Sequence, residues 1–586
     1  MKKLIYKKLE SFLSLEEKQD YYCEVEYLES DGYQYIDTGI YFDCNYDMQY
    51  KVKAMSLSAN RSIIISSYAG ASYASFGLEF GGSTNAGAIR VYYNTTGTAV
   101  SEYTSSLPIN VGRIIDCKYD STENKIYFSY DDETATSYNT SKGDLPNTYP
   151  IRLFLDLRSN PSAIRNPERI YYCQIIKNGV LVRDFIPVLD LNYVPCLYDK
   201  VSGRLFYNQG TGSFSYGREI HEVEYLTADG NQYIDTGVHP SFTLSAEVKC
   251  QSTVQSVCPI GAGGSGSNNR WQIIASTQYY SGRVGNKTTT NQKASYNDLV
   301  VAKLDAINYT FTVNNNTVSL TGSTIGTIPS ENTLSLFRRN MYAGSVAYAS
   351  FIGNIYWCKI WENNVLIRDY VSAIDQNGVG FMFDKVTHTI FDNAGTGNFA
   401  YPAVELEYIE STGTQYIDTG IYLTNNHSVE LDFQLTATGQ TRAGLFGVLN
   451  GSGSSPRFGV LVSPTGSKLE SGYGATNIYY QIEESNTNRH IIKQAKNLLY
   501  YDNSLIYTFA TATFSINVTA PLGNFTYTNY TPAKAKYYSS KWWDNSTLVR
   551  DFIPVFKDGS AGFYDKVNDV FYANVGTGTF NVGKIK

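Results

Sequence analysis

The sequence of 586 residues contains no uninterrupted apolar run of about 18 residues, the length that a membrane-spanning helix requires. It also lacks a dense basic stretch, since 47 Lys and Arg residues stand against 54 Asp and Glu residues, for a net charge of −7. A protein that follows a phosphate backbone needs such a stretch. We therefore expect neither insertion into a membrane nor binding to nucleic acid.

Segment 1–22 lacks the apolar core of a secretory signal, because Lys7, Lys8 and Glu10 interrupt it. Export by the ordinary secretory route is therefore not expected. The apolar residues of this segment fall near helical spacing, and Ser14-Leu15-Glu16-Glu17 resembles a capping box, so we predict a short amphipathic helical arm. The arm could pack on the first domain, dock onto a partner or sister chain, or be disordered.

Signatures of catalysis are also missing. The five histidines are scattered, and no two stand at metal-ligand spacing. No Gly-x-Ser-x-Gly nucleophile elbow occurs. Residues 261–266 fit the glycine pattern of dinucleotide-binding loops, but the strand-like segment 270–274 follows where a helix is needed, so this is a loop. We predict that the protein is not an enzyme.

What the sequence does contain is one motif in three copies. Gln34-Tyr35-Ile36-Asp37-Thr38-Gly39 recurs from Gln232 and again from Gln415. These intervals are far longer than the roughly 20–50 residues of a solenoid repeat, so each copy is a whole domain. Each copy closes with an Arg-Asp pair, an aromatic-Asp-Lys-Val segment and a Gly-Thr-Gly turn. The Arg-Asp pairs are Arg183-Asp184, Arg368-Asp369 and Arg550-Asp551.

Short alternating strands and polar turns dominate each copy. Residues 242–249 and 428–433 alternate apolar with polar side chains, as strands with one buried face do. The 51 Tyr residues, with frequent Thr, Ser, Asn and Gly, favour β-structure and turns. We predict an all-β protein of three tandem antiparallel β-sandwich domains behind the short helical arm. The predicted boundaries are 1–22 for the arm and 23–217, 218–402 and 403–586 for the sandwiches.

Cysteine is confined to the first two copies, with five residues in the first, three in the second and none in the third. A fold that one copy builds without cysteine depends neither on disulfides nor on cysteine-bound metal. Cys173 and Cys358 stand ten residues before the Arg-Asp pair, where the third copy has Ser540, so we expect a small buried strand residue there. The composition fits synthesis in a reducing cell interior.

The segment 229–237, followed by 242–246, resembles the start of a laminin-G-like domain of the concanavalin A-like lectin/glucanase superfamily. Segment 353–362 is similar to the last core strand of that family. The Arg-Asp-Phe-Ile-Pro and Tyr-Asp-Lys-Val ending resembles a tail common in such domains of gut-bacterial phages and their hosts. The resemblance covers nearly everything from residue 24 to residue 583 and implies a concanavalin A-like jelly roll. It implies no single function, because the superfamily includes lectins, glucanases and structural modules.

Glucanases of this superfamily carry a Glu-x-Asp-x-Glu triple, whose period of two places all three carboxylates on one strand face beside a sugar bond. No such triple occurs in this sequence. Acidic pairs do stand on the opening strands, and we interpret them as solvated strand faces. The pairs are Glu24 and Glu26, Glu222 and Glu224, and Glu405 and Glu407.

An aspartate precedes the Thr-Gly of the motif in every copy, as Asp37, Asp235 and Asp418. Because laminin-G-like domains often bind calcium on a sheet rim, the resemblance implies calcium as one role for these carboxylates. Accepting N–H groups of a turn is the other role, and we favour it. We expect the Arg-Asp pairs to form structural ion pairs or strand-end locks. Residues shared by all copies should be scaffold, and recognition should lie where the copies differ.

The copies differ most at 68–93, 261–283 and 451–480, which are rich in Gly, Ser, Asn and aromatic residues. Tyrosine among small polar residues suits sugar stacking and adaptable hydrogen bonding. The alternative is that these aromatic residues belong to the core or to hairpins. The candidate glycan-binding residues are Trp271, Tyr279 and Tyr280 in the second copy and Tyr473, Tyr479 and Tyr480 in the third.

Duplicated domains without catalytic signatures favour a multivalent binder or spacer. We expect a non-enzymatic structural protein of a tailed-phage virion, in a fibre or decoration of head or tail, whose lectin-like domains adhere to host-surface glycan. A bacterial cell-surface adhesin or glycan-binding protein is the first alternative, and a glycan-active enzyme is the second. The expected location is the virion, assembled in the host cytoplasm. The arm is expected to attach the chain to other virion proteins and to mediate self-association as a dimer or trimer.

Overall fold

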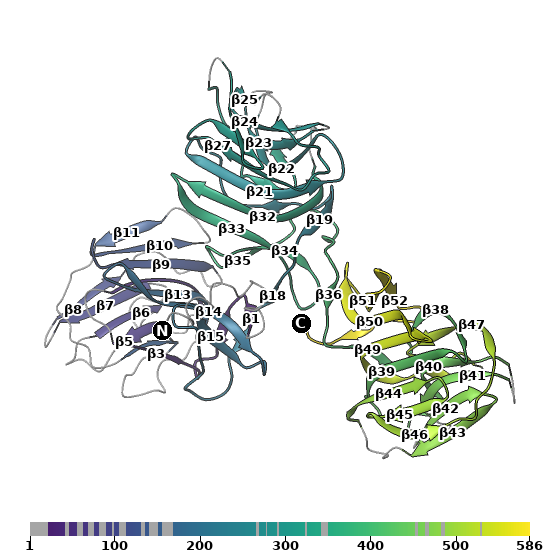
Figure 1. Cartoon of the computed structure of the whole chain (residues 1–586). Coiled ribbons are helices and arrows are strands. Elements are labelled where there is room, and N and C mark those ends of the chain that lie inside the picture. Colours follow the sequence, from purple (N-terminus) through teal and green to yellow (C-terminus); the bar gives the residue numbers. More distant parts are fainter. Residues whose placement is uncertain are drawn as a thin grey trace, which may run out of the picture. The chain divides into compact units, whose positions relative to one another are not determined.

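A computed structural model gives the structure of most of the chain. It describes residues 22–41, 46–54, 62–67, 75–80, 89–95, 99–104, 113–130, 135–139, 150–154, 168–264, 269–276, 278–289, 292–322, 325–341, 350–451, 455–462, 468–481, 487–527 and 530–586. These residues form strands and connecting turns, and Figure 1 draws no coiled ribbon among them. The predicted all-β class is confirmed. No helix in this described part has the length and hydropathy needed to cross a membrane.

The first sandwich packs a main sheet against a second sheet. Main-sheet strands are β1 (Tyr22–Val25), β2 (Leu28–Ser30), β4 (Tyr46–Ala54), β9 (Ile114–Asp120), β10 (Lys125–Tyr130), β11 (Thr136–Asn139), β13 (Glu168–Lys177), β14 (Val180–Asp190), β15 (Pro195–Asp199), β16 (Arg204–Phe206) and β17 (Ser215–Tyr216). Second-sheet strands are β3 (Ile36–Tyr41), β5 (Ser62–Ser67), β6 (Ser75–Phe80), β7 (Ile89–Thr95), β8 (Ala99–Thr104) and β12 (Pro150–Leu153). Both sheets contribute to one core, in which Met48 and Val52 lie with Ile36 and Leu153.

The second sandwich repeats this arrangement. Main-sheet strands are β18 (Glu219–Glu222), β19 (Leu226–Asp229), β21 (Leu244–Ser252), β27 (Val300–Asp305), β28 (Thr310–Val313), β29 (Asn316–Ser319), β32 (Ile352–Glu362), β33 (Val365–Ile374), β34 (Gly380–Asp384) and β35 (Thr389–Phe391). Second-sheet strands are β20 (Ile234–Asp235), β22 (Val257–Gly263), β23 (Arg270–Ala275), β24 (Tyr279–Val284), β25 (Lys287–Thr288), β26 (Gln292–Lys293), β30 (Ser335–Leu336) and β31 (Arg339–Met341). The sheets approach so closely at Gly282 that a Cβ there would lie 2.6 Å from the ring of Phe311.

The third sandwich has the same two layers. Main-sheet strands are β36 (Val404–Glu405), β37 (Ile409–Thr412), β39 (His427–Leu435), β44 (Arg489–Ala495), β45 (Leu498–Tyr501), β46 (Ser504–Thr508), β49 (Lys534–Asp544), β50 (Thr547–Lys557), β51 (Ser560–Asp565), β52 (Val570–Ala573) and β53 (Asn581–Val582). Second-sheet strands are β38 (Ile417–Thr424), β40 (Ala443–Leu449), β41 (Arg457–Val462), β42 (Lys468–Gly474), β43 (Thr476–Gln481), β47 (Ser515–Leu522) and β48 (Thr531–Pro532). Phe446 and Trp542 join the layers, with ring centroids 6.2 Å apart.

Strand order is shared between the copies. The main sheet of the third sandwich runs β46-β45-β44-β39-β49-β50-β51-β52, and that of the first runs β11-β10-β9-β4-β13-β14-β15-β16. In β39 every second residue is buried, including Val429, Leu431 and Phe433, because alternate side chains of a strand point to opposite faces. The predicted two-sheet antiparallel sandwich is therefore observed.

Tight hairpins set the register of the longest strands. Asn178 and Gly179 connect β13 to β14 with φ of 51° and 75°, and Asn363 and Asn364 connect β32 to β33 with φ of 50° and 64°. Two successive positive φ angles match the twist of a two-residue hairpin, and Asn and Gly tolerate them. Each hairpin fixes the Arg-Asp pair on its second strand.

The chain divides into two compact units. One comprises residues 1–222, 229–375 and 381–396, and the other comprises 223–228, 376–380 and 397–586. The first two sandwiches share the first unit because β18 pairs with both β1 and β33. The domain boundaries drawn from the repeats stay a prediction. The predicted helical arm, 1–22, lies outside the described residues except for Tyr22, which begins β1.

Candidate functional site

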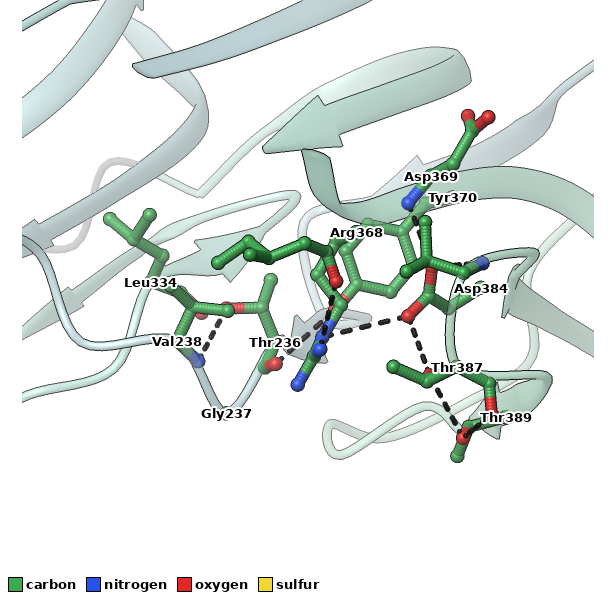
Figure 2. Close-up of polar contacts among 12 residues, drawn as sticks. Thr236, Gly237, Val238, Leu334, Arg368, Asp369, Tyr370, Asp384, Thr387 and Thr389 are labelled. Carbon is green, nitrogen blue, oxygen red and sulfur yellow. Dashed lines mark hydrogen bonds and ion pairs between the residues drawn. The ribbon is translucent and has the colours of Figure 1, made fainter. Parts of the chain in front are cut away.

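The repeated Asp-Thr-Gly forms a turn in all three sandwiches. In the second, Asp235 Oδ1 accepts the Gly237 N–H at 3.1 Å. Thr236 Oγ1 donates to the Leu334 carbonyl at 2.7 Å, and both residues are drawn in Figure 2. Gly237 has φ +67°, a conformation that glycine adopts without strain. Asp37 and Asp418 accept the equivalent N–H groups, at 2.9 and 3.0 Å. The carboxylates therefore have the turn role that we favoured.

The arginine of each Arg-Asp pair forms its ion pair with the aspartate of the aromatic-Asp-Lys-Val segment and not with the aspartate next to it in the sequence. Arg368 Nε lies 3.6 Å from Asp384 Oδ2, and the Asp369 N–H donates to Asp384 Oδ1 at 2.7 Å (Figure 2). Burial raises the pKa of Asp384, whose side chain is fully enclosed. The same ion pair recurs between Arg183 and Asp199 at 3.6 Å and between Arg550 and Asp565 at 3.5 Å. These shared residues are scaffold, since they tie the Arg-Asp strand to the aromatic-Asp-Lys-Val segment.

The Gly-Thr-Gly turn is scaffold too. A Cβ on Gly576 would lie 1.9 Å from the carbonyl oxygen of Thr414, and one on Gly395 would lie 2.0 Å from that of Asn231. Only glycine permits so close an approach of two backbones. The turn thereby packs against the residues just before the motif tyrosine.

The structure contradicts three of the predicted glycan-binding residues. Trp271 and Tyr280 are 0% exposed and Tyr473 is 4% exposed, so no ring face is free for a sugar. Tyr280 donates from its hydroxyl to the Tyr296 carbonyl, and Tyr473 packs edge-on against Phe514. These side chains point between the sheets, so they belong to the core, which is the alternative that the sequence left open.

The other three predicted residues keep some exposed surface. Tyr479 is 52% exposed on β43, and Tyr480 and Tyr279 are half-buried. Tyr480 packs against Tyr501, with centroids 5.4 Å apart. Tyr479 and Tyr480 are consecutive strand residues, so they point to opposite faces and do not form one platform.

A pocket of about 620 Å³ opens in the third sandwich, beside the motif itself. Its size lies within the roughly 300–1,000 Å³ typical of ligand sites. The walls come from the start of β38, the end of β40 and the loop after β47. The residues that line it are Tyr416, Leu449, Asn450, Gly451, Val518, Asn524, Phe525, Thr526, Tyr527 and Tyr530.

Aromatic rings form one wall of this pocket. Tyr530 lies 5.5 Å from Tyr527 and 5.7 Å from Phe525, centroid to centroid, and all three pack on Leu449. Burial raises the pKa of Tyr530, so its hydroxyl is neutral at ordinary pH. Asn524 adds a polar group: its Oδ1 is buried and accepts no hydrogen bond from any residue that the structure describes. The pocket thus combines ring faces with an asparagine side chain whose buried amide oxygen has no donor among the described residues.

Tyr416 distinguishes this sandwich from its sister copies. In the second sandwich the guanidinium of Arg338 lies 3.0 Å from the ring centroid of Tyr233, and in the first Arg152 lies 4.9 Å from that of Tyr35. Within the described residues no cation lies over Tyr416, whose ring instead lines the pocket. A cation therefore lies over the motif tyrosine in two copies, and no described cation does so in the third, while the tyrosine itself is half-buried in each.

One substitution accounts for the difference between the second and third copies. The motif threonine donates to the Leu334 carbonyl in the second sandwich and to the Ala520 carbonyl in the third, which aligns the two segments. The third residue after Leu334 and the third residue after Ala520 both have a positive φ, which is 64° at Phe337 and 90° at Gly523. The next residue is Arg338 in one copy and Asn524 in the other. Asn524 is too short to cover the ring.

Sequence reasoning missed this site. Tyr416 belongs to the shared motif and was therefore interpreted as scaffold. The exchange of Arg338 for Asn524 is visible only after the segments are aligned through the hydrogen bonds of the threonine.

Comparisons with known proteins give two solved structures that are similar to the chain. The LG1-3 region of the laminin alpha2 chain is 11% identical, with a TM-score of 0.24, and the match covers 96% of this chain and 100% of that one. Domains LG4-5 of the mouse laminin alpha1 chain are 11% identical, with a TM-score of 0.20, and that match covers 60% and 92%. No family model and no curated protein matches the sequence.

Proposed function

We propose that the chain is a non-enzymatic adhesion protein whose third sandwich binds a glycan in the pocket beside Tyr416. The observation that carries this proposal is the uncovered Tyr416 ring in a pocket of about 620 Å³, where a sister copy places Arg338 over the equivalent ring. The missing acidic triple and nucleophile elbow in the sequence support a binding role without turnover.

The chemistry of the pocket suits a sugar. The apolar face of a pyranose packs on aromatic rings, and Tyr416, Tyr527 and Tyr530 offer such rings together with hydroxyl groups. Asn524 also lines the pocket, and a turn of its side chain would present the amide, whose buried Oδ1 has no donor among the described residues, to a sugar hydroxyl. Binding at one such pocket is weak, so presentation of many copies raises the apparent affinity through avidity.

The wider role in this proposal is that of a tailed-phage virion protein, in a fibre or decoration of head or tail, with host-surface glycan as the ligand. Three tandem sandwiches and the phage-like closing segments of the sequence support it. In this role the arm, 1–22, attaches the chain to other virion proteins and to its own copies as a dimer or trimer. The second candidate is a bacterial surface adhesin. Mass spectrometry of purified virions against host envelope fractions separates the two.

Calcium is a secondary part of the proposal. The Oδ1 atoms of Asp37, Asp235 and Asp418 already accept turn N–H groups. The second oxygen lies 3.6 Å from Arg152 Nε in the first sandwich and accepts from Thr519 Oγ1 at 2.9 Å in the third, so Asp235 is the best candidate for a cation. Calorimetric titration of the full chain with Ca²⁺ tests this, and heat that is unchanged in Asp235→Asn excludes the turn of the second sandwich.

The test of glycan binding uses the full chain displayed on beads against a glycan array. Asn524→Arg restores the side chain of the sister copy, so we expect at least a tenfold loss of binding, which corresponds to about 1.4 kcal/mol. Tyr422→Ala is the matched control. Tyr422 is 57% exposed on β38, the strand that follows Tyr416, and it does not line the pocket.

Two outcomes contradict the proposal. One is a wild-type chain that captures no glycan. The other is that the Asn524→Arg variant binds glycan as tightly as the wild type while the Tyr479→Ala variant loses binding. That result assigns recognition to the exposed surface of β43 instead of the pocket. New reducing ends after incubation with β-glucans would contradict the non-enzymatic part.

A further inference from the structure

The opening strands of the first two sandwiches pair with each other. In the antiparallel pairing of β1 with β18, Glu24 lies opposite Ile220 and Val25 lies opposite Glu219. One step further along this register, Cys23 faces His221. Glu219 stands two residues before His221, so both side chains lie on the same face of β18.

Three side chains of different chemistry converge at this pairing. His221 Nε2 lies 3.8 Å from Cys23 Sγ and 2.8 Å from Glu219 Oε2. The thiol, the imidazole and the carboxylate oxygen all lie within 4.8 Å of one another. Glu219 and His221 are buried, and Cys23 is half-buried. Within the described residues this is the group of Cys, His and acidic side chains that meets metal-ligand spacing.

We propose that Cys23, Glu219 and His221 bind a divalent transition-metal ion, with zinc as the preferred ion. Bond lengths of about 2.3 Å to sulfur and about 2.0–2.1 Å to nitrogen or oxygen place tetrahedral ligands roughly 3.3–3.6 Å apart. The sulfur-to-nitrogen distance of 3.8 Å is already close to this value. The nitrogen-to-oxygen distance of 2.8 Å is that of a hydrogen bond and opens by about half an ångström on binding.

The donor set selects the class of ion. Thiolate and imidazole favour Zn²⁺ and similar borderline ions, whereas Ca²⁺ and Mg²⁺ prefer oxygen ligands alone. When the ion binds, the S–H bond of Cys23 breaks, a metal–sulfur bond forms and the proton leaves to solvent, without electron transfer. The proton shared by Glu219 Oε2 and His221 Nε2 moves to Nδ1 of the imidazole or to solvent, and each of the two atoms then forms one bond to the ion. Three protein ligands leave the fourth position to water or an external ligand.

The three copies show that this site is separate from the sandwich fold. The residue directly before the first glutamate of the acidic pair is the equivalent position in the three copies. It is Cys23 in the first, His221 in the second and Val404 in the third. The third sandwich folds with a valine there, so neither the thiol nor the imidazole is required by the fold. Pairing of β1 with β18 brings the two polar versions together. The ion would thus fasten the opening strands of the first two sandwiches, a property independent of the glycan pocket.

The test is metal titration of the full chain after removal of bound metal, in a buffer with a phosphine reductant. Co²⁺ replaces Zn²⁺ as the spectroscopic probe, because cobalt bound to a thiolate absorbs in the near ultraviolet. We expect one Co²⁺ per chain with this absorption, and its loss when Zn²⁺ is added. Cys23→Val and His221→Val copy the third sandwich at each position, so both should fold and both should lose the absorption.

The matched control is Cys358→Ser, because the third sandwich has Ser540 at that strand position, opposite Phe552 as Cys358 is opposite Tyr370. This variant should keep one thiolate-bound Co²⁺ per chain. The proposal fails if the wild type shows no thiolate absorption, if His221→Val keeps it, or if Cys358→Ser loses it. In the first case the trio is a buried hydrogen-bonded pair beside a core thiol.

Discussion

Replacement of Asp384 by alanine should destabilise the second sandwich by about 3–5 kcal/mol, the usual cost of removing one partner of a buried ion pair. Asp384 is fully buried and accepts from the Asp369 N–H at 2.7 Å, the Val386 N–H at 3.1 Å and the Thr387 hydroxyl at 2.6 Å. The guanidinium of Arg368 lies 3.6 Å from the same carboxylate. Alanine leaves all these donors without the acceptor.

The asparagine variant separates the turn from the charge. Both backbone N–H groups donate to Oδ1, which Asp384→Asn keeps, whereas Arg368 and Thr387 interact with Oδ2, which becomes an amide nitrogen. We expect a smaller loss of about 1.5–3 kcal/mol, the range for hydrogen bonds to charged groups. Burial raises the pKa of Asp384, so the attraction to Arg368 is partly offset by desolvation, and the lower part of the range is expected.

The assay is urea unfolding of the full chain, followed by tryptophan fluorescence and far-ultraviolet circular dichroism. All five tryptophans, at positions 271, 357, 361, 542 and 543, lie in the second and third copies. Asp384→Ala should shift an unfolding transition that both fluorescence and circular dichroism detect. Asp199→Ala lies in the first copy, which has no tryptophan, so it should shift a transition that circular dichroism detects and tryptophan fluorescence does not. Asp392→Ala is the control, because its ion pair with Arg218 is exposed and contributes at most about 1 kcal/mol. A loss for Asp384→Ala no larger than for this control would refute the reasoning.

Three further predictions follow from the same structure. Burial lowers the pKa of His388 from 6.5 to about 3 and raises that of Glu24 from 4.5 to about 7. Between pH 4.5 and 6.5 each state then binds one proton at these two groups, on Glu24 in the folded chain and on His388 in the unfolded chain. Below about pH 4.5 the unfolded chain binds a second proton, on Glu24, and the folded chain does not. The free energy of unfolding therefore falls as the pH falls toward 3. His388→Phe should remove this acid-side fall in urea midpoints, and an unchanged profile contradicts the assignment. Gly576→Ala should cost about 1–3 kcal/mol in the same assay, since its Cβ would meet the Thr414 carbonyl, and an unchanged midpoint would contradict this close approach. Deletion of residues 1–22 should leave the sandwiches folded but absent from particles, and normal incorporation would exclude the anchoring role.

Much of the fold could be predicted because its signals are local. Alternation in segments such as 428–433 has the period of a strand, and β39 buries the expected side chains. The Asp-Thr-Gly turn needs only a carboxylate, an N–H two residues later and a glycine at positive φ, so its role was readable from three letters. The ion pairs were predicted, but their partners were not, because Arg368 reaches Asp384 through pairing of distant strands.

The candidate site was harder to predict because it depends on which face of a strand is buried. Trp271 lies in a buried run of β23 and Tyr280 lies on the buried face of β24, and composition alone does not distinguish such core positions from a ligand surface. Cys23 and His221 are 198 residues apart and meet only through the pairing of β1 with β18. No spacing rule within one strand detects such a pair.

The last prediction concerns the stability cost of an open pocket. A guanidinium over an aromatic ring stabilises by about 0.5–2 kcal/mol, depending on exposure, and the second sandwich has this contact where Arg338 covers Tyr233. Among the residues of the third sandwich that the structure describes, no cation makes this contact with Tyr416. Asn524→Arg should therefore raise the urea midpoint of the transition reported by Trp542 and Trp543 while it abolishes glycan binding.

These opposite effects on stability and binding distinguish a ligand-binding pocket from a mere gap in packing. If the substituted arginine covers Tyr416, the chain gains a contact and loses the space for a ligand, as expected when function is built at the expense of stability. Tyr422→Ala, outside the pocket, should change neither property appreciably. If Asn524→Arg lowers the midpoint, the new side chain does not reach the ring, and the equivalence of Asn524 with Arg338 is wrong. If the midpoint rises but glycan binding persists, the Tyr416 ring is not the surface on which the sugar packs.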